Sequence, residues 1–567
     1  MNLIGNINAI PFRRFRGGGG VAPFPSIPGM IARWSAKGLT NEEMSKNPVW
    51  KDLTGNDMDL QMKNFAWGGM SGVGGYVDNW NSSADWSINN YWVNSHTDHK
   101  LQFITASTVV QAKSNNIYNA ENVYKNILKV NGLTEAVNKG SVGGLRISAT
   151  DPITSKAIKT FSFDTDGVIQ ISFDDVLQDY CVVYFVYGNN TNDIDITIEQ
   201  LPLYPGALVF DGVDDYGVCE NFPILTKEKG YTVVALRQWI TRGEIAQGLV
   251  SNVKNWIKDG AFLLEYRNIQ ADHLNKPISF GAIGSENDLP HILTYQTSKS
   301  YNGVSITTGN FEGTDVLHVG KLAPTNVGTC INAAIWELVF LDHDATEEEL
   351  TKIKDYFVKT YPWLFPDQAW TVTGKTNEDE DRATIANITG NGNNLVLSNF
   401  GFAEGSGYNE EGEYAGYLVT DGVDDKIFSS TFKLGKDFTV VGEWEFLQDI
   451  NNNSGLRKIS SFIIRNNASG LSLLINRTSQ ATTVFNVKSL KAFCSNGLLV
   501  KNDWTEQIDT VSQIVTSSNS KLSIACRNDG VTEYDKFAFK NLAIYPMVLS
   551  KDDCIKAYNY LQTLKAK

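Results

Sequence analysis

The sequence predicts an all-β protein with two jelly-roll sandwiches, the first interrupted by a smaller inserted β-sandwich and each ending in a short helix. A repeat provides the first observation. Residues 207–216 reappear almost unchanged as residues 417–426, with Asp-Gly-Val-Asp-Asp at the centre of both. A repeat this specific marks a duplicated domain. Two copies of one fold, together with one insertion, therefore account for most of the chain.

The spacing between matched segments provides the second observation, because it is not constant. Leu-Thr-Gly-Asn from Leu53 matches Ile-Thr-Gly-Asn from Ile388, 335 positions later, whereas the Asp-Gly-Val-Asp-Asp segments are 210 apart. Residues 338–349 align without gaps onto 542–553, at a spacing of 204. The drop of 125 between the first two spacings predicts an insertion of that length in the first copy.

Four regions follow from these spacings. We place the boundaries where matched segments end, and where Pro202 and Pro205 lead back into the first copy. The predicted regions are an extended peptide at 1–28, a first jelly roll at 29–79 plus 205–365, an inserted β-sandwich at 80–204, and a second jelly roll at 366–567.

Within each copy the elements have local signals. Residues 231–239 and 438–446 carry β-branched and aromatic residues near period two, as strands do. Residues 334–341 are too apolar for an edge strand. Thr346, followed three positions later by a glutamate, predicts a capping box and a helix, and the plan repeats from Ser550.

The insertion also predicts strands. Five segments alternate or run apolar at strand length. They lie at 100–105, 158–163, 168–173, 180–186 and 194–199. Asp164-Thr-Asp-Gly167 predicts a short hairpin between the second and the third. Five strands in about 120 residues indicate a small β-sandwich.

Composition excludes several classes of function. A net charge of −14 argues against general nucleic-acid binding, and no apolar run reaches the ~20 residues of a membrane span. The first ten residues lack the pattern of a signal peptide. Six scattered cysteines without Cys-x-x-Cys spacing predict reduced core thiols in a chain made in a cytosol.

A basic and aromatic cluster lies near the start of the chain, ahead of four glycines. It consists of Phe12, Arg13, Arg14, Phe15 and Arg16. Aromatic and arginine side chains are the residues that anchor interfaces, so the cluster predicts a docking peptide for a partner protein. A disordered tail is the alternative, and the sequence leaves both open.

The repeated acidic motif has two interpretations. Carboxylates on loops bind Ca²⁺, which makes Asp211, Asp214, Asp421 and Asp424 weak calcium candidates. A tight turn needs the same residues, because Asp accepts backbone hydrogen bonds and Gly adopts positive φ. We favour the turn and expect no cofactor.

Tryptophan is abundant, with 13 in the chain, and several lie near the start of the insertion. Sugar rings stack on exposed aromatic faces, so Trp86, Tyr91 and Trp92 are candidates for glycan binding. Packing in a core is the alternative interpretation, and we favour it for Trp67.

Catalysis has no strong candidate in the sequence. Jelly-roll glycosidases present Glu-x-Asp-x-Glu on a strand, and no predicted strand has that spacing. The nearest acidic run, residues 378–381, lies in a predicted loop. His96 and His99 form a close pair without a third ligand. We therefore expect a protein that is not an enzyme.

Longer motifs carry a resemblance to a known family. They include Ile31-Ala-Arg-Trp-Ser-Ala-Lys-Gly-Leu-Thr, Asn47-Pro-Val-Trp-Lys-Asp-Leu-Thr-Gly-Asn, Lys63-Asn-Phe-Ala-Trp-Gly-Gly-Met-Ser-Gly, and residues 196–218. With them, most of residues 28–365 resembles laminin-G/concanavalin A-like structural proteins of Bacteroidales phages and prophages, and the likeness continues more loosely to 567. The resemblance implies a virion component similar to the head fibres or tail fibres of crAss-like phages.

The resemblance and the residue patterns together predict a function. We expect a head fibre of the virion, made in the bacterial cytoplasm, attached through its N-terminal segment to capsid or other virion proteins. Its lectin-like domains would bind host or mucosal glycans, and fibres of this kind form trimers or dimers. A tail fibre or receptor-binding protein is the first alternative, and a carbohydrate-active enzyme or secreted adhesin is the second.

Overall fold

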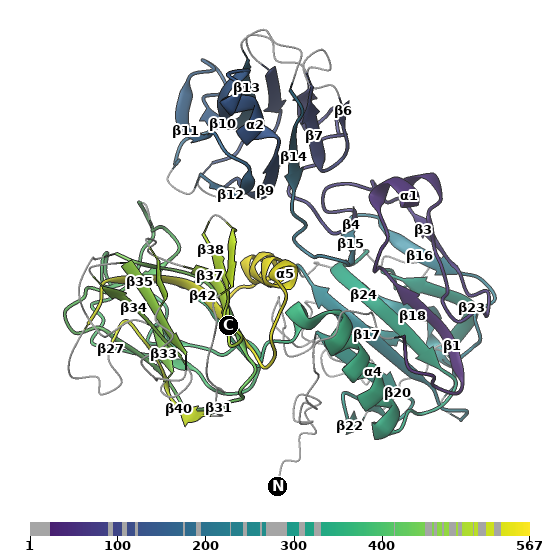
Figure 1. The fold of residues 1–567 in the computed structure, drawn as a ribbon. Helices are drawn as coiled ribbons and strands as arrows, with labels where there is room; N and C mark the ends of the chain where they lie inside the picture. The colour runs from purple at the N-terminus through teal and green to yellow at the C-terminus, as the bar shows by residue number, and fades with distance from the viewer. Residues whose placement is uncertain are drawn as a thin grey trace. The chain divides into compact units, whose positions relative to one another are not determined.

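The fold is seen in a computed structural model (Figure 1). It describes residues 23–88, 95–104, 110–119, 123–173, 176–188, 194–226, 228–241, 247–260, 263–267, 292–305, 312–322, 330–412, 414–447, 456–458, 462–467, 470–475, 483–485, 490–502, 504–508, 518–526 and 534–566. Contacts divide the chain into two units. The first takes Met1–Tyr76 and Pro202–Leu364, and the second takes Val77–Leu201 and Phe365–Lys567.

Two antiparallel sheets form the jelly roll of the first unit. The larger has the order β22-β21-β20-β17-β24-β15-β4, with β1 also paired to β24, and the smaller has the order β19-β18-β23-β16-β3-β2. The strands are β1 (Met30–Ser35), β2 (Val49–Trp50), β3 (Leu60–Lys63), β4 (Gly72–Val73), β15 (Leu208–Asp211), β16 (Tyr216–Cys219), β17 (Thr232–Trp239), β18 (Gln247–Gly260), β19 (Leu263–Arg267), β20 (Leu293–Thr297), β21 (Ser300–Tyr301), β22 (Val304–Ser305), β23 (Glu312–Val319) and β24 (Asn332–Leu341).

The two sheets meet over one core. Alternate residues of β17, among them Val233, Ala235 and Trp239, point into it together with Trp34 and Trp50. Strand β24 pairs with β1, β15 and β17, which confirms the prediction that this apolar segment is an interior strand. Alternate side chains of these strands thus face this core, as the period-two geometry of a strand requires.

Two helices of the first unit begin at side-chain caps, one of which the sequence predicts. Helix α4 (Glu347–Thr360) has the predicted capping box between Thr346 and Glu349, and a 3₁₀ turn, η3 (Pro362–Leu364), follows it. Helix α1 (Asn41–Lys46) is capped by Thr40. No helix among the described residues is long and apolar enough to cross a membrane.

The inserted segment, Val77–Leu201, forms two five-stranded sheets around a core of its own. Their orders are β11-β10-β13-β8-β5 and β12-β9-β14-β7-β6. The elements are β5 (Trp86–Ile88), β6 (Ser95–His96), β7 (Lys100–Phe103), β8 (Val110–Ser114), β9 (Lys125–Asn131), α2 (Leu133–Asn138), β10 (Val142–Thr150), β11 (Ala157–Phe163), β12 (Gly167–Ser172), β13 (Cys181–Gly188) and β14 (Ile196–Gln200).

The predicted hairpin at 164–167 is wrong. Strands β11 and β12 belong to different sheets, since β11 pairs with β10 and β12 pairs with β9. The connecting turn is held by α2 instead: Asp166 Oδ1 accepts hydrogen bonds from the backbone N–H groups of Leu133 and Thr134, at 2.6 and 3.2 Å. A carboxylate at the start of a helix takes up N–H groups that the helix leaves unpaired, so this turn redirects the chain.

The second jelly roll repeats the plan of the first. Its large sheets have the orders β28-β29-β42-β32-β37-β38-β39, with β25 on β42, and β26-β27-β30-β41-β33-β34-β35-β36, beside a β31-β40 ribbon. The elements are β25 (Gln368–Thr371), β26 (Thr384–Ile385), β27 (Leu395–Ser398), β28 (Gly407–Tyr408), β29 (Leu418–Val419), β30 (Lys426–Ser429), β31 (Phe432–Leu434), β32 (Thr439–Phe446), β33 (Leu456–Lys458), β34 (Phe462–Asn467), β35 (Gly470–Ile475), β36 (Thr483–Phe485), β37 (Leu490–Cys494), β38 (Leu498–Lys501), β39 (Glu506–Ile508), β40 (Ser518–Ser520), β41 (Leu522–Ile524), β42 (Phe537–Tyr545) and α5 (Lys551–Gln562).

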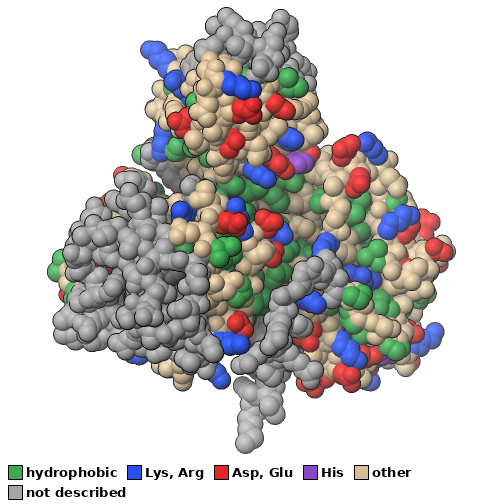
Figure 2. All heavy atoms as spheres, in the orientation of Figure 1, with side chains coloured by type: hydrophobic (Ala, Val, Ile, Leu, Met, Phe, Trp, Pro, Cys, Tyr) green, Lys and Arg blue, Asp and Glu red, His purple; other side chains and the backbone are tan. Residues whose placement is uncertain are grey.

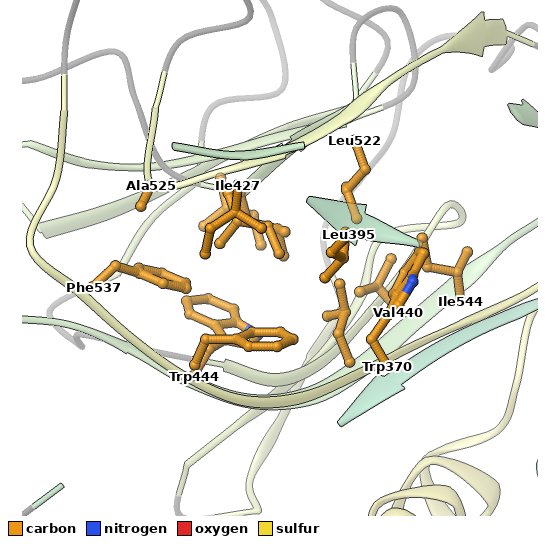
Figure 3. Close-up of a cluster of buried hydrophobic side chains, with 14 of the residues drawn as sticks. Trp370, Leu395, Ile427, Val440, Trp444, Leu522, Ala525, Phe537 and Ile544 are labelled. Carbon is orange, nitrogen blue, oxygen red and sulfur yellow. The ribbon is translucent and has the colours of Figure 1, made fainter. Parts of the chain in front are cut away.

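Side chains from both large sheets of this jelly roll meet in a single core (Figure 3). Trp370 and Trp444 from one sheet face Ile427 and Leu522 from the other. The duplication extends to an irregularity. The register of β17 on β24 shifts between Leu236 and Arg237, and that of β32 on β42 shifts between Glu443 and Trp444. A shared register shift of this kind supports descent of the two jelly rolls from one domain.

All six cysteines are free and buried, which confirms the prediction of reduced core thiols.

Charge on the surface is mixed. Acidic and basic side chains are interspersed on the face of the described residues that Figure 2 shows. Interspersed charge of this kind keeps a protein dispersed in water.

Candidate functional site

The repeated Asp-Gly-Val-Asp-Asp motif connects β15 to β16 in a tight turn. Asp211 Oδ1 accepts a hydrogen bond from the backbone N–H of Val213 at 2.8 Å. Gly212 has φ +83°, and a Cβ there would lie 2.9 Å from the Cβ of Asn332. Positive φ and lack of space both require glycine at this position. The turn is therefore the reason for the Asp-Gly pair.

The last aspartate of the motif is buried and fastens the turn to a second loop. Asp215 Oδ2 accepts from the backbone N–H of Asp211 at 3.0 Å, and its Oδ1 accepts from the hydroxyl of Ser71 at 3.0 Å. The Ser71 hydroxyl oxygen also accepts from the backbone N–H of Ala66 at 2.8 Å. We call Asp211, Asp215 and Ser71 the acidic clasp of the first jelly roll.

The second jelly roll has the same clasp. Asp425 Oδ2 accepts from the N–H of Asp421 at 2.7 Å, and its Oδ1 accepts from the Ser406 hydroxyl at 3.1 Å. The Ser406 oxygen accepts from the N–H of Gly401 at 2.9 Å, and Asp421 Oδ1 accepts from the N–H of Val423 at 2.7 Å. Corresponding atoms thus make corresponding bonds in both copies.

Two asparagines complete the correspondence. Asn64 and Asn399, both at positive φ, donate from Nδ2 to the backbone oxygens of Asp214 and Asp424 at 3.2 and 3.1 Å. Asparagine tolerates this left-handed backbone better than most residues. These contacts tie the loop before β4 or β28 to the turn.

Burial and neighbouring charge shape the electrostatics of each clasp. Burial, together with the charge of Asp211, raises the pKa of Asp215 to about 7. In the second copy, burial raises the pKa of Asp425 to about 6, against hydrogen bonds from Asp421 and Ser406 that lower it. Burial is the main cause in both copies, and the two further acids beside each carboxyl add to it.

The carboxylates could also meet at a cation. One oxygen from each of Asp211, Asp214 and Asp215 lies within 4.8 Å of the others, and Asp421, Asp424 and Asp425 repeat this arrangement. Ca²⁺ takes six to eight oxygen ligands, roughly, and here both oxygens of the buried aspartate already accept hydrogen bonds. The donor set therefore fits a turn better than a calcium site.

The clasp predicts matched effects in the two copies. Ser71→Ala removes the donor to buried Asp215 and is expected to lower the stability of the first jelly roll by about 1–3 kcal/mol. Ser406→Ala should do the same to the second jelly roll only. Hydrogen exchange on β15 and β29 in the full chain measures each effect. Equal exchange in all three proteins would contradict a structural role for the clasp.

The segment just before β1 lies against helix α4. Phe24 packs edge-on against Tyr356, with ring centroids 4.8 Å apart, and the guanidinium of Arg33 lies 4.2 Å from the centre of the Phe24 ring. Ile27 is buried. We call Phe24 to Ile27 the strap. Phe12, Arg13, Arg14, Phe15 and Arg16, the predicted anchor, lie outside the described residues.

Arg33, beneath the strap, pairs with a fully buried acid. Its Nε and Nη2 donate to Glu337 at 3.0 and 3.2 Å, and Nη2 also donates to the Tyr356 hydroxyl at 2.9 Å. The hydroxyls of Tyr361 and Ser35 donate to Glu337 as well, at 2.9 and 3.2 Å. Burial raises the pKa of Glu337, and Arg33 opposes that rise.

The predicted glycan-binding role is wrong for one of the three aromatic candidates. Trp86 is only 3% exposed, and it packs edge-on against Trp80 and Tyr184 in the core of the inserted sandwich. A sugar ring cannot stack on a buried face, so Trp86 does not fit the predicted glycan role. Tyr91 and Trp92 lie outside the described residues. Trp67, predicted to be a core residue, packs against the first core and stacks on Phe65.

Comparison with known proteins assigns no family. No family model and no curated protein matches the chain. Trypanosoma rangeli sialidase in complex with sialic acid is similar at 9% identity and a TM-score of 0.23, with 82% of this chain and 83% of that chain covered. Truncated AlyQ with CBM32 and alginate lyase domains is similar at 9% identity and 0.18, with 60% and 92% covered.

The binding domain of botulinum neurotoxin serotype D is similar at 10% identity and a TM-score of 0.22, with 62% of this chain and 89% of that chain covered. Likenesses this weak carry no functional assignment. The class of protein follows from the sheets themselves: the chain is an all-β protein with two jelly-roll sandwiches, the first carrying an inserted β-sandwich.

Proposed function

We propose that the chain is a non-enzymatic structural protein of a phage virion, a head fibre that is anchored through Phe12–Arg16. The strap is the observation that carries this proposal. Phe24 and Ile27 fasten the chain to the first jelly roll, so the basic and aromatic residues that precede them connect to a folded domain at a defined place. A short basic and aromatic segment that precedes a folded domain in the chain suits attachment to a larger surface.

The use of the acidic groups supports a structural role. Asp215 and Asp425 hold turns, and Glu337 holds the strand–helix network beneath the strap. Carboxylates with raised pKa are often catalytic, but each of these has its oxygens engaged by neighbours within one fold. This arrangement favours a scaffold over a hydrolase.

The partners follow from the chemistry of the anchor. Arginine and phenylalanine side chains fill pockets and pair with carboxylates, so the proposed partner is a capsid protein or another virion protein with an acidic and apolar groove. Several copies of the fibre would assemble as a dimer or trimer. The protein would be made in the bacterial cytoplasm and would reside in the virion.

Head and tail attachment are distinguished on purified particles. Gold-labelled antibody against the second jelly roll should mark the head of the phage. Label on the tail would favour the alternative, a tail fibre or receptor-binding protein. Particles without label, with the protein in the secreted fraction, would contradict the virion proposal.

We further propose that the jelly rolls and the insertion bind glycans. The full chain should bind a subset of host or mucosal glycans on an array, and Trp92→Ala and Tyr91→Ala should weaken that binding if these aromatics stack on sugar. Release of reducing sugar from host capsule, abolished by one Asp or Glu substitution, would establish the enzyme alternative and contradict the proposal.

A further inference from the structure

The root of the inserted sandwich is closed by side chains. The chain passes between the two units at Tyr76–Val77 and again at Leu201–Pro202. Just inside these points, the backbone N–H of Asp78 donates to Gln200 Oε1 at 2.9 Å, and Gln200 Nε2 donates to the backbone oxygen of Asp78 at 3.1 Å. One amide group thus joins the two ends of the insertion.

The carboxyl of Asp78 extends this closure into both sheets of the insertion. The hydroxyl of Tyr124 donates to Asp78 Oδ2 at 2.5 Å, and Asn126 Nδ2 donates to the same oxygen at 3.1 Å and to Gln200 Oε1 at 2.9 Å. The hydroxyls of Tyr124 and Tyr184 lie 2.5 Å apart, and either one can donate the hydrogen bond between them. Asn126 lies on β9 and Tyr184 on β13, which belong to different sheets.

Only one group of this cluster changes charge near neutral pH. Burial raises the pKa of Asp78 to about 7, more than its interactions with Tyr124, Trp86 and Asn126 lower it. Burial raises the pKa of the Tyr118 hydroxyl to about 12, and holds the pKa values of Tyr124 and Tyr184 well above their ordinary range. The neighbouring acid Asp85 adds negative charge, which disfavours ionisation of Asp78 further.

We propose that Asp78, Tyr124, Asn126, Tyr184 and Gln200 form a pH-responsive clasp, closed while Asp78 is protonated and loosened when Asp78 ionises. The physical reason is the cost of a buried charge. The side chains of Tyr124 and Asn126, which bond the Asp78 carboxyl, are neutral, as is Trp86 beside it, so none of them supplies a cation to balance an ionised Asp78. This pH-responsive clasp goes beyond the proposed function, because it sets how firmly the two ends of the insertion are joined to each other.

The direction of the effect follows from the two protonation states. The folded insertion holds the Asp78 proton up to about pH 7, whereas the opened chain releases it near the ordinary value of 3.8. Opening is therefore coupled to proton release, and stability is lost as pH rises from 3.8 through 7. Between pH 5.5 and 8.5 the opening equilibrium should increase about 30-fold and level off above pH 7.

Hydrogen exchange in the full chain tests the pH-responsive clasp around Asp78. Amides of β9 and β14 are followed at pH 5.5 and pH 8.5, with the intrinsic pH effect on exchange removed. Wild type should open about 30-fold more at pH 8.5, and Asp78→Asn, which keeps the shape without the charge, should open equally at both values within about threefold. The matched control Asp179→Asn changes an exposed acid of the insertion and should behave as wild type.

Two results overturn the proposal. One is a wild-type opening equilibrium that does not change between the two pH values, a result that stands even if the Asp78→Asn protein fails to fold. The other is an Asp78→Asn protein with the same pH dependence as wild type, because the dependence would then arise from another group.

Discussion

Glu337→Ala is expected to destabilise the first jelly roll by about 3–5 kcal/mol, because it leaves the largely buried guanidinium of Arg33 without its partner. The loss should appear as faster hydrogen exchange of β1 and β24 in the full chain. The same substitution should also loosen the strap, since Arg33 stacks on Phe24 and holds Tyr356 through a hydrogen bond. Fluorescence or exchange at residues 23–28 would report that second effect.

The second jelly roll supplies the control. Strand pairing places Ser35 opposite Glu337 and Thr371 opposite Asn541, so Arg33 and Glu337 correspond to Ala369 and Asn541. The double variant Arg33→Ala, Glu337→Asn copies that neutral pair and should cost at least about 2 kcal/mol less than Glu337→Ala alone. A double variant as unstable as the single variant would show that the ion pair is not what sets the stability there.

Replacement of the anchor residues is expected to release the protein from the particle. Phe12→Ala together with Phe15→Ala removes two aromatic side chains of the kind that dominate interfaces, and should weaken attachment by about 30-fold or more. Attachment is measured as the copies that remain on purified particles after washing. The folded domains should keep wild-type stability, because the strap begins after these residues.

A charge variant separates the two parts of the anchor. Arg13, Arg14 and Arg16 changed to glutamine should weaken attachment in a salt-dependent manner, because exposed ion pairs are screened as ionic strength rises. Attachment that is indifferent to all five substitutions would contradict the docking role of this segment. It would favour the alternative interpretation, a disordered tail.

Much of the architecture could be predicted from the sequence, because repeats and short local patterns mark the domains and the helix starts. The unequal spacing of the Leu53 and Asp211 repeats reported an insertion, and the Thr346–Glu349 spacing reported a helix start. The structure has the inserted segment at Val77–Leu201, three residues earlier at each end than 80–204. The spacing gives the length of the insertion but not its exact limits. Those limits depend on tertiary contacts such as the hydrogen bond from the backbone N–H of Leu203 to the backbone oxygen of Gly75, which lies within the first unit.

What the sequence did not reveal are contacts between distant residues. Arg33 and Glu337 are separated by 304 positions, and Asp78 and Gln200 by 122, so no local period links them. Ser71 was within reach of prediction. It holds the same place after Asn64 as Ser406 does after Asn399, and a serine matched with the repeated aspartates was the available signal.

The hairpin at 164–167 and the role of Trp86 were misjudged for a related reason. A turn sequence shows that the chain reverses, but it does not show whether the next strand joins the same sheet, and here Asp166 binds α2. A tryptophan near a loop is equally compatible with a stacking platform and a core. Burial, which depends on the whole fold, decides between them.

The location of residues 1–28 in intact virions tests the central proposal most directly. A cryo-EM reconstruction of the particle is expected to show this segment ordered in a groove of a capsid or head protein, with the strap and the first jelly roll immediately outside it. A reconstruction in which residues 1–28 are exposed to solvent and make no contact with another virion protein would contradict the account.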